Sequence, residues 1–282
     1  MKRKAFVATL AALLIANAQA DTVGLYLGGQ IWQSEASGVF GEKNTLSDFN
    51  LKKEQQSNYF VVVEHPFPLL PNVRISSTTL DTTGKTNSTQ EYSDDNETSH
   101  VDVHVDFDVD ASFNVSYVDY TLYYELFDNG LFSFDLGLTA RDFGGAVTEM
   151  ETANIVTTTR DRIWDGEEHD EHDYHNITEI TKAVTTDKLK TNEIEPMLYV
   201  AGNISLPSTG LSVFAQGDFL LIDDHSIYDY QVGLGYDLVD NRMMDLNLTL
   251  GYRAVDMELK DLNTLYTDLD FKGVFVGVIA RF

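Results

Sequence analysis

The sequence contains no cysteine, which excludes both a disulfide framework and a lipidated N-terminal cysteine. It is also poor in basic residues, with 19 Lys and Arg against 45 Asp and Glu, and its formal net charge is −26. Phosphate would be repelled by so acidic a chain, so we expect no nucleic-acid partner. Beyond the N-terminus no run of about 18 apolar residues occurs, and the sequence therefore predicts no transmembrane helix.

The N-terminal segment has the three parts of a secretory signal peptide. Lys2, Arg3 and Lys4 are positive, residues 5–16 are apolar, and Ala18-Gln19-Ala20 is a cleavage site of the small-x-small type. The apolar part is too short to span a membrane, although a retained N-terminal anchor is the alternative. We expect residues 1–20 to be removed on export. Residues 21–282 would then carry 16 basic and 45 acidic residues, a formal net charge of −29.

The C-terminal residue, Phe282, ends an alternating segment. Val274, Val276, Val278 and Ala280 share its face, and because side chains of a strand alternate between two faces, these residues form one apolar stripe. A terminal aromatic residue on such a stripe resembles the C-terminal signature of bacterial outer-membrane β-barrels. The resemblance implies that Phe282 is an assembly signal and that the barrel assembly machinery is a partner.

Similar alternation recurs along the rest of the chain. Apolar and aromatic residues occupy one face of each segment, and Asp, Asn, Gly, Thr and Arg occupy the other. In a soluble β-sandwich or soluble barrel the outer face would be polar, so the pattern favours a barrel in lipid. The predicted strands span 22–34, 57–67, 72–82, 112–127, 131–143, 193–206, 210–221, 226–239, 243–257 and 270–282.

The connections between these strands alternate between short turns and longer polar segments. The long connections are 35–56, 83–111 and 144–192. An up-and-down antiparallel β-barrel with tight periplasmic turns and long external loops has this rhythm, and ten is an even strand number, as single-chain bacterial barrels have. Residues 100–110, 154–162 and 177–186 have strand-like patterns inside the loops, so the sequence predicts strand there too and leaves a twelve-strand barrel as the alternative.

Five strand segments stand out: Thr121-Leu-Tyr-Tyr-Glu-Leu126, Leu136-Gly-Leu-Thr-Ala-Arg141, Pro196-Met-Leu-Tyr-Val200, Tyr228-Asp-Tyr-Gln231 and Leu250-Gly-Tyr-Arg253. They resemble a family of marine proteobacterial outer-membrane β-barrel proteins that has no assigned biochemical function. The resemblance implies export to the outer membrane and a barrel that contacts outer-membrane lipids and lipopolysaccharide, and it carries over no catalytic residue.

Charged residues gather on the polar face of the predicted strands. Carboxylates inside a narrow barrel must be solvated, paired with arginine or protonated. We expect an ion-pair and water network that fills the lumen, and a narrow cation-favouring or small-solute channel is the alternative because rings of acidic residues select cations. The predicted network comprises Asp119, Glu125, Asp135, Arg141, Asp218, Asp229, Asp237, Asp245 and Arg253.

The longest loop contains a run of histidines and acids. Imidazole and carboxylate groups together suit zinc or another divalent cation. The spacing matches no compact structural site, so the sequence predicts at most a loosely bound divalent cation and no cofactor, with a solvated loop as the alternative. The candidate ligands are His169, His172, His175, Asp170 and Asp173.

An acid–histidine pattern at 102–108 invites comparison with the omptin proteases, which are ten-strand outer-membrane barrels. Alternating Asp and Val also makes an ordinary amphipathic strand, and no nucleophile motif is present, so we expect no enzyme and keep an omptin-like hydrolase as an alternative. Residues 84–111 and 144–192 hold 19 acidic and six basic residues. The sequence therefore predicts a non-enzymatic outer-membrane barrel with an envelope or surface-interaction role, in which divalent cations bridge acidic loops to lipopolysaccharide phosphates.

Overall fold

The structure is a computed structural model, and all regular elements of the residues that it describes are β-strands. The residues that it describes are 23–42, 47–67, 69–95, 99–144, 146–162, 174–190, 194–222, 225–241, 244–262 and 265–282. The predicted signal peptide lies outside these ranges. Within them, no helix has the length and the apolar character that crossing a membrane requires.

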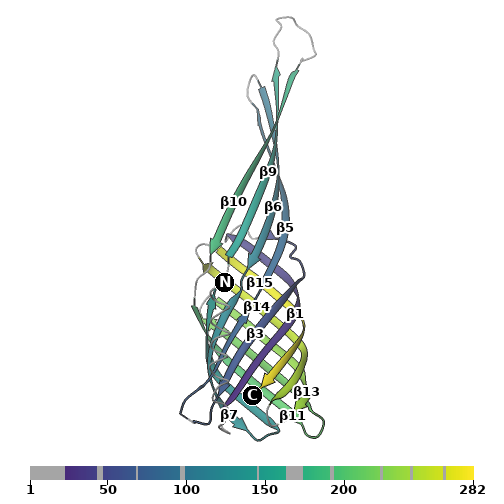
Figure 1. The fold of residues 1–282 in the computed structure, drawn as a ribbon. Coiled ribbons are helices and arrows are strands. Elements are labelled where there is room, and N and C mark those ends of the chain that lie inside the picture. Colours follow the sequence, from purple (N-terminus) through teal and green to yellow (C-terminus); the bar gives the residue numbers. More distant parts are fainter. Residues whose placement is uncertain are drawn as a thin grey trace, which may run out of the picture.

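Ten strands form a closed antiparallel barrel, which confirms the predicted fold class (Figure 1). Each strand pairs with the next one around the wall, and β15 closes the circle by pairing with β1 from Tyr26↔Arg281 to Glu42↔Leu265. The barrel strands are β1 (Gly24–Glu42), β3 (Glu54–Glu64), β4 (Asn72–Thr78), β7 (Tyr117–Asp128), β8 (Phe132–Phe143), β11 (Ile194–Leu206), β12 (Leu211–Ile222), β13 (His225–Asp240), β14 (Asp245–Leu262) and β15 (Leu265–Arg281). A two-residue strand, β2 (Ser47–Asp48), pairs with the end of β1.

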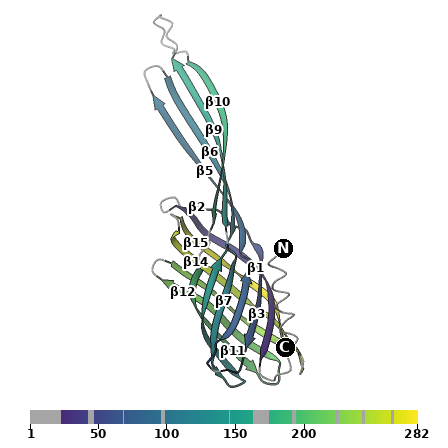
Figure 2. The same cartoon turned by 60° about the vertical axis from the view of Figure 1, so that its left-hand side comes forward.

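A second, four-stranded sheet projects from one end of the barrel (Figures 1 and 2). Its strands are β5 (Asp81–Asp95), β6 (Ser99–Asn114), β9 (Ala146–Arg162) and β10 (Tyr174–Lys190), in the spatial order β10-β9-β6-β5. We call it the projecting sheet. Each of its strands continues a barrel strand with a break of a few residues, so the two hairpins β5–β6 and β9–β10 are extensions of the wall that pair with each other through β6 and β9.

The projecting sheet accounts for most of two connections that the sequence pattern placed in loops, 83–111 and 144–192. The expectation of strand inside these loops is confirmed, whereas the twelve-strand barrel is wrong, because the additional strands form a separate sheet. The connection at 35–56 is partly strand as well, since β1 runs on to Glu42. The opposite end of the barrel has only the short turns, and we call it the short-turn end.

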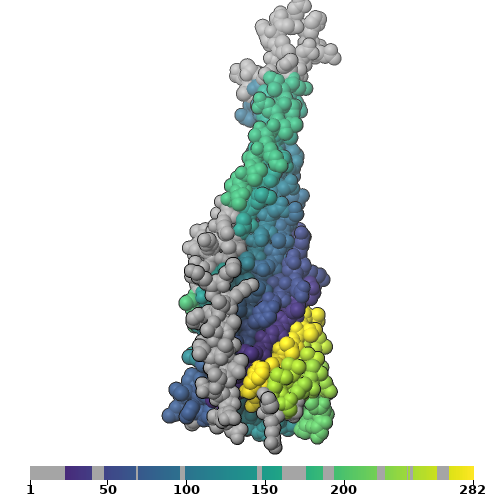
Figure 3. All heavy atoms as spheres, in the orientation of Figure 1, coloured from purple at the N-terminus to yellow at the C-terminus, as the bar shows by residue number. Residues whose placement is uncertain are grey.

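The outer face of the barrel is apolar, as the alternation predicts. Leu234 is 53% exposed and Val276 is 60% exposed, and the aromatic and aliphatic residues beside them are similarly accessible. Figure 3 shows the surfaces of β15 (yellow) and β1 (purple) in contact where the barrel closes. A wide band of exposed apolar side chains is costly in water and stable in hydrocarbon, so this surface suits a lipid bilayer.

The inner face differs from the uniformly polar face that the alternation suggested. Near the projecting sheet it is apolar, and buried side chains from many strands form one cluster there, the apolar plug. Part of the plug comes from the projecting sheet, since Phe113 of β6 packs edge to face against Phe49, between β2 and β3, with ring centroids 5.7 Å apart. Its larger members are Trp32, Phe49, Leu80, Phe113, Tyr117, Phe143, Met197, Leu220, Ile227, Met257, Leu269, Phe271 and Phe275.

Candidate functional site

An ion-pair layer crosses the lumen next to the apolar plug. Arg141 of β8 is fully buried and donates to Asp119 of β7 through Nε (2.8 Å) and Nη2 (2.9 Å). The same Nη2 also donates to Asp229 of β13 on another part of the wall, at 2.7 Å. The guanidinium lies over the Tyr117 ring, 3.7 Å from its centroid. Arg141 therefore ties β7, β8 and β13 together from inside the barrel.

Arg253 of β14 completes this layer. It donates to both oxygens of Asp229, through Nε (3.0 Å) and Nη2 (2.9 Å), and Nη2 reaches the Tyr117 hydroxyl at 3.1 Å. The Tyr117 hydroxyl in turn donates to Asp229 at 2.5 Å. A buried carboxylate is stable only when its lone pairs are satisfied, and Asp229 accepts bonds from three side chains. Hydrogen bonds and ion pairs thus join Asp119, Arg141, Tyr117, Asp229 and Arg253 in one network.

Asp218 of β12 lies directly opposite Asp229 of β13, and both are buried. Two like charges at opposed positions of neighbouring strands repel each other. The arginines bond to Asp229, while Asp218 accepts a hydrogen bond from Thr139 Oγ1 at 2.5 Å. Asp218 therefore belongs to the layer through a hydroxyl contact. Thr139 and Tyr117 were not among the predicted network residues, although their positions on the inward face could have indicated them.

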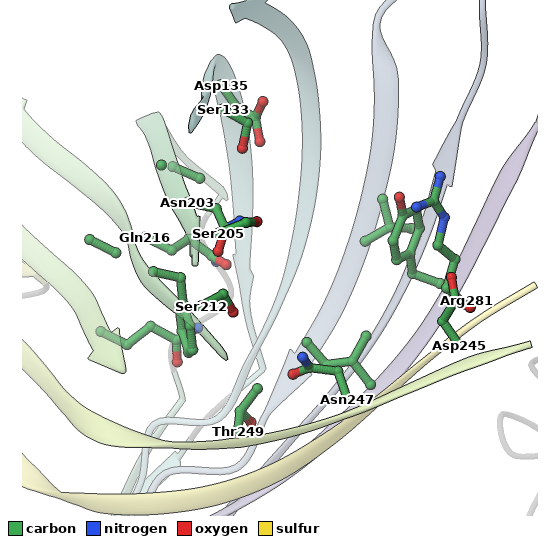
Figure 4. Close-up of a pocket in the computed structure, with 18 of the residues that line it drawn as sticks. Ser133, Asp135, Asn203, Ser205, Ser212, Gln216, Asp245, Asn247, Thr249 and Arg281 are labelled. Carbon is green, nitrogen blue, oxygen red and sulfur yellow. The ribbon is translucent and has the colours of Figure 1, made fainter. Parts of the chain in front are cut away.

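A polar cavity of about 830 Å³ lies in the lumen at the short-turn end (Figure 4). Gln30 and Gln231 both line it, and a 3.1 Å hydrogen bond from Gln30 Nε2 to Gln231 Oε1 joins β1 to β13, past β15 and β14, on the side towards the ion-pair layer. Three residues of the predicted network, Asp135, Asp237 and Asp245, line this cavity. They are therefore separate from the ion-pair layer.

Glu125, the remaining predicted network residue, lies near the short-turn end of β7 and is not among the residues that line the cavity. It is exposed and stands directly opposite Asp135 across β7 and β8. The predicted network thus divides into two groups: Asp119, Arg141, Asp218, Asp229 and Arg253 meet in the ion-pair layer, and Glu125, Asp135, Asp237 and Asp245 lie at the short-turn end. The alternation of side chains along each strand predicts that all nine lie on the inner face, but it does not predict their position along the barrel axis.

The projecting sheet carries a row of histidines and acids along β6. His100 contacts Asp95 through Nδ1 and Asp102 through Nε2, the latter at 2.9 Å. His104 lies 3.2 Å from Glu91 and 3.3 Å from Asp106. The hydrogen bond to Asp95 and the charge of Asp102 raise the pKa of His100 above its ordinary value. Asp102, His104 and Asp106, which invited the comparison with the omptins, therefore belong to a row of ion pairs on the projecting sheet.

The predicted metal ligands fall outside the description. Residues 163–173, which include His169, Asp170, His172 and Asp173, lie outside the described ranges, and so does the side chain of His175 in β10. Within the described ranges, no three His, Asp or Glu side chains are grouped so that they could hold a metal ion.

No family model and no curated protein matches the chain. Several solved barrels are similar to it in structure. A FadL homologue of Pseudomonas aeruginosa has a TM-score of 0.31 and 7% identity, with 93% of this chain and 90% of that chain covered. The translocator domain of the autotransporter NalP from Neisseria meningitidis has a TM-score of 0.31 and 12% identity over 100% and 96% of the chains. The outer membrane protease OmpT from Escherichia coli has a TM-score of 0.29 and 10% identity over 94% and 97%.

Proposed function

We propose that the protein is an integral outer-membrane β-barrel without enzymatic activity, which holds the projecting sheet at the cell surface as a binding surface. One observation carries this proposal: the four strands of the projecting sheet are continuations of barrel strands, so an apolar barrel wall anchors a polar sheet. In bacterial barrels short turns face the periplasm and long connections face outward, which supports an external position of the projecting sheet.

The net negative charge of the projecting sheet supports binding to an anionic partner through bridging cations. Its four strands hold 13 acidic and six basic residues, and β6 alone contributes Asp102, Asp106, Asp108 and Asp110 on one face. Lipopolysaccharide phosphates are anionic too, so direct contact is unfavourable and divalent cations must bridge the two surfaces. His169, His172 and His175 with Asp170 and Asp173 would add ligands for such cations.

Binding to immobilised lipopolysaccharide tests this proposal. The purified protein in detergent should bind in the presence of Ca²⁺ and lose binding when a chelator is added. Changing Asp102, Asp106, Asp108 and Asp110 together to Asn keeps the strand pattern and should weaken binding, while Asp237→Asn in the lumen serves as the matched control. Binding that is indifferent to both the chelator and the fourfold change would contradict the proposal.

A narrow cation-favouring channel is the second candidate, and the acidic cavity at the short-turn end favours it. Such a channel would need the ion-pair layer and the apolar plug to open, because buried side chains fill the lumen there. Planar-bilayer recordings distinguish the two candidates. Steady conductance that changes with Asp135→Asn supports the channel, whereas a silent barrel supports the surface-binding function.

A further inference from the structure

The cavity at the short-turn end has a chemical character of its own, separate from the projecting sheet. Four carboxylates line it, from Glu64, Asp135, Asp237 and Asp245, against two guanidinium groups, from Arg74 and Arg281. Figure 4 shows Asp135 on one side of the hollow, with Asp245 and Arg281 on the other. The lining therefore carries a net negative charge, so it attracts cations and repels anions.

Both guanidinium groups are already in contact with aromatic rings. The Arg74 Cζ atom lies 4.1 Å from the centroid of the Phe60 ring, and the Arg281 Cζ atom lies 5.2 Å from that of Tyr26. By contrast, one oxygen of Asp135 and one of Asp245 are buried and have no hydrogen-bond partner within the described part of the chain. Buried polar atoms are nearly always satisfied in proteins, and both residues line the cavity, so each carboxyl group has unused acceptor capacity beside that space.

The acids at the Asp135 side repel one another. Asp135 stands opposite Glu125 across the β7–β8 pair, and Glu64 of β3 is held near by the Tyr123 hydroxyl, which donates to Glu64 Oε1 at 2.8 Å. Like charges at directly opposed positions destabilise a sheet. A cation bound between Glu64 and Asp135 would remove this repulsion.

Aromatic side chains form the wall beside these acids. Tyr123 and Tyr199 lie with their ring centroids 5.5 Å apart, and Val62, Tyr26 and Phe60 pack against them. Gly137 lies between the two tyrosines in the sheet, and a Cβ atom there would come within 2.6 Å of Tyr123 Cβ. The glycine thus lets the tyrosines meet over β8, and aromatic faces beside carboxylates suit an alkylammonium group.

We propose that this cavity binds a small organic polycation, a linear diamine or triamine that enters from the short-turn end. The carboxylates stand on different strands, and no three of the described acids or histidines are grouped as ligands, so a metal ion with its short ligand distances does not fit. A chain with amines at both ends reaches carboxylates on separate walls, and its methylene groups lie against the tyrosines. This inference does not depend on what the projecting sheet binds.

Calorimetric titration of the purified protein with spermidine and putrescine, at about 0.15 M salt to screen surface charge, tests the proposal. We expect saturable binding below millimolar concentration, no binding of butanediol, and no displacement by equimolar Mg²⁺. Asp135→Asn should weaken spermidine binding at least about tenfold, because it removes a charged hydrogen bond. Tyr199→Leu should also weaken binding, through loss of the aromatic wall.

Asp106→Asn is the matched control, since it removes the same charge from the projecting sheet. It should leave the affinity unchanged, and heat-modifiable migration on gels checks that each variant is folded. Should Asp135→Asn fail to fold, Asp245→Asn tests the opposite wall. The proposal is overturned if no binding occurs below millimolar concentration, if equimolar Mg²⁺ displaces spermidine, or if Asp106→Asn weakens binding as much as the cavity variants do.

Discussion

Asp119 of β7 and Arg141 of β8 lie directly opposite each other, and the Arg141 guanidinium donates two hydrogen bonds to that single carboxylate. A third bond from the same guanidinium reaches Asp229 on β13, so one side chain connects neighbouring and distant parts of the wall. The pair lies next to the apolar plug, where water has little access. Its contribution therefore differs in kind from that of the exposed ion pairs on the projecting sheet.

Replacing Arg141 by Met leaves Asp119 without its partner and removes one partner of Asp229. Removing one member of a buried pair typically costs about 3–5 kcal/mol, so the free energy of unfolding should fall by that amount in urea titrations followed by tryptophan fluorescence. Arg160→Met is the control, because Arg160 pairs with Asp102 at 3.3 Å on the exposed sheet, and such pairs contribute about 0–1 kcal/mol. Equal effects of the two changes would contradict the buried role of Arg141.

Leu234 tests the lipid-facing wall. It lies on β13 between Val213 and Leu250 of the neighbouring strands, with 53% of its surface exposed. Arginine on the lipid face of a barrel costs about 2–4 kcal/mol at the bilayer midplane, so Leu234→Arg should lower the unfolding free energy in lipid vesicles by that amount. Leu234→Ala should cost much less, and a Leu234→Arg protein as stable as the Ala variant would argue against a lipid environment there.

The interactions of His100 should weaken as the pH rises. The pKa of His100 is raised by its hydrogen bond with Asp95 and by the charge of Asp102, so the folded sheet favours the protonated ring. The resulting stabilisation is fully present below the ordinary pKa of 6.5 and is lost as the pH rises through the higher pKa of the folded state. Proton NMR of the imidazole between about pH 5 and 9 measures this pKa. Asp95→Asn should lower it, whereas an unchanged pKa in that variant would show that Asp95 has no effect.

Phe282 should matter for assembly more than for the finished barrel. Its backbone donates to the Leu25 carbonyl at 2.9 Å and its carbonyl accepts from the Leu25 amide at 3.3 Å, contacts that do not involve the side chain. We expect Phe282→Gln to reduce the amount of protein in the outer membrane of cells while a protein refolded in detergent stays as stable as the parent. A matching loss of stability in detergent would assign the side chain a structural role instead.

The ten barrel strands were predictable because each one is a local pattern. The alternation of apolar residues such as Leu234 with polar residues such as Asp229 predicts directly which face contacts lipid and which lines the lumen. Strand ends were harder to place, since β14 and β15 form a hairpin that continues to Leu262 and Leu265, beyond the apolar stripe. Beyond the apolar stripe these strands are rich in polar residues, so their sequence is easily mistaken for that of a loop.

The projecting sheet was only half predictable. Alternation from His100 to Asp110 indicates a strand, but the pairing of β6 with β9 joins Val103 to Thr157, and nothing local to either segment specifies that partner. The ion-pair layer has the same limit. Arg141 and Asp229 are recognisable as inward residues, whereas their contact depends on barrel circumference and on the height of each strand in the wall.

The continuity of β5, β6, β9 and β10 with β4, β7, β8 and β11 has a mechanical consequence. A pull on the tip of the projecting sheet, directed away from the membrane, runs along four covalent backbones at once and enters the barrel wall lengthwise. Tension in that direction loads the hydrogen bonds between neighbouring strands in shear. Many of these bonds must then break together, whereas a sideways pull would break them one after another. A partner that pulls on the sheet would therefore have to extract strands from the barrel before the sheet could detach from it.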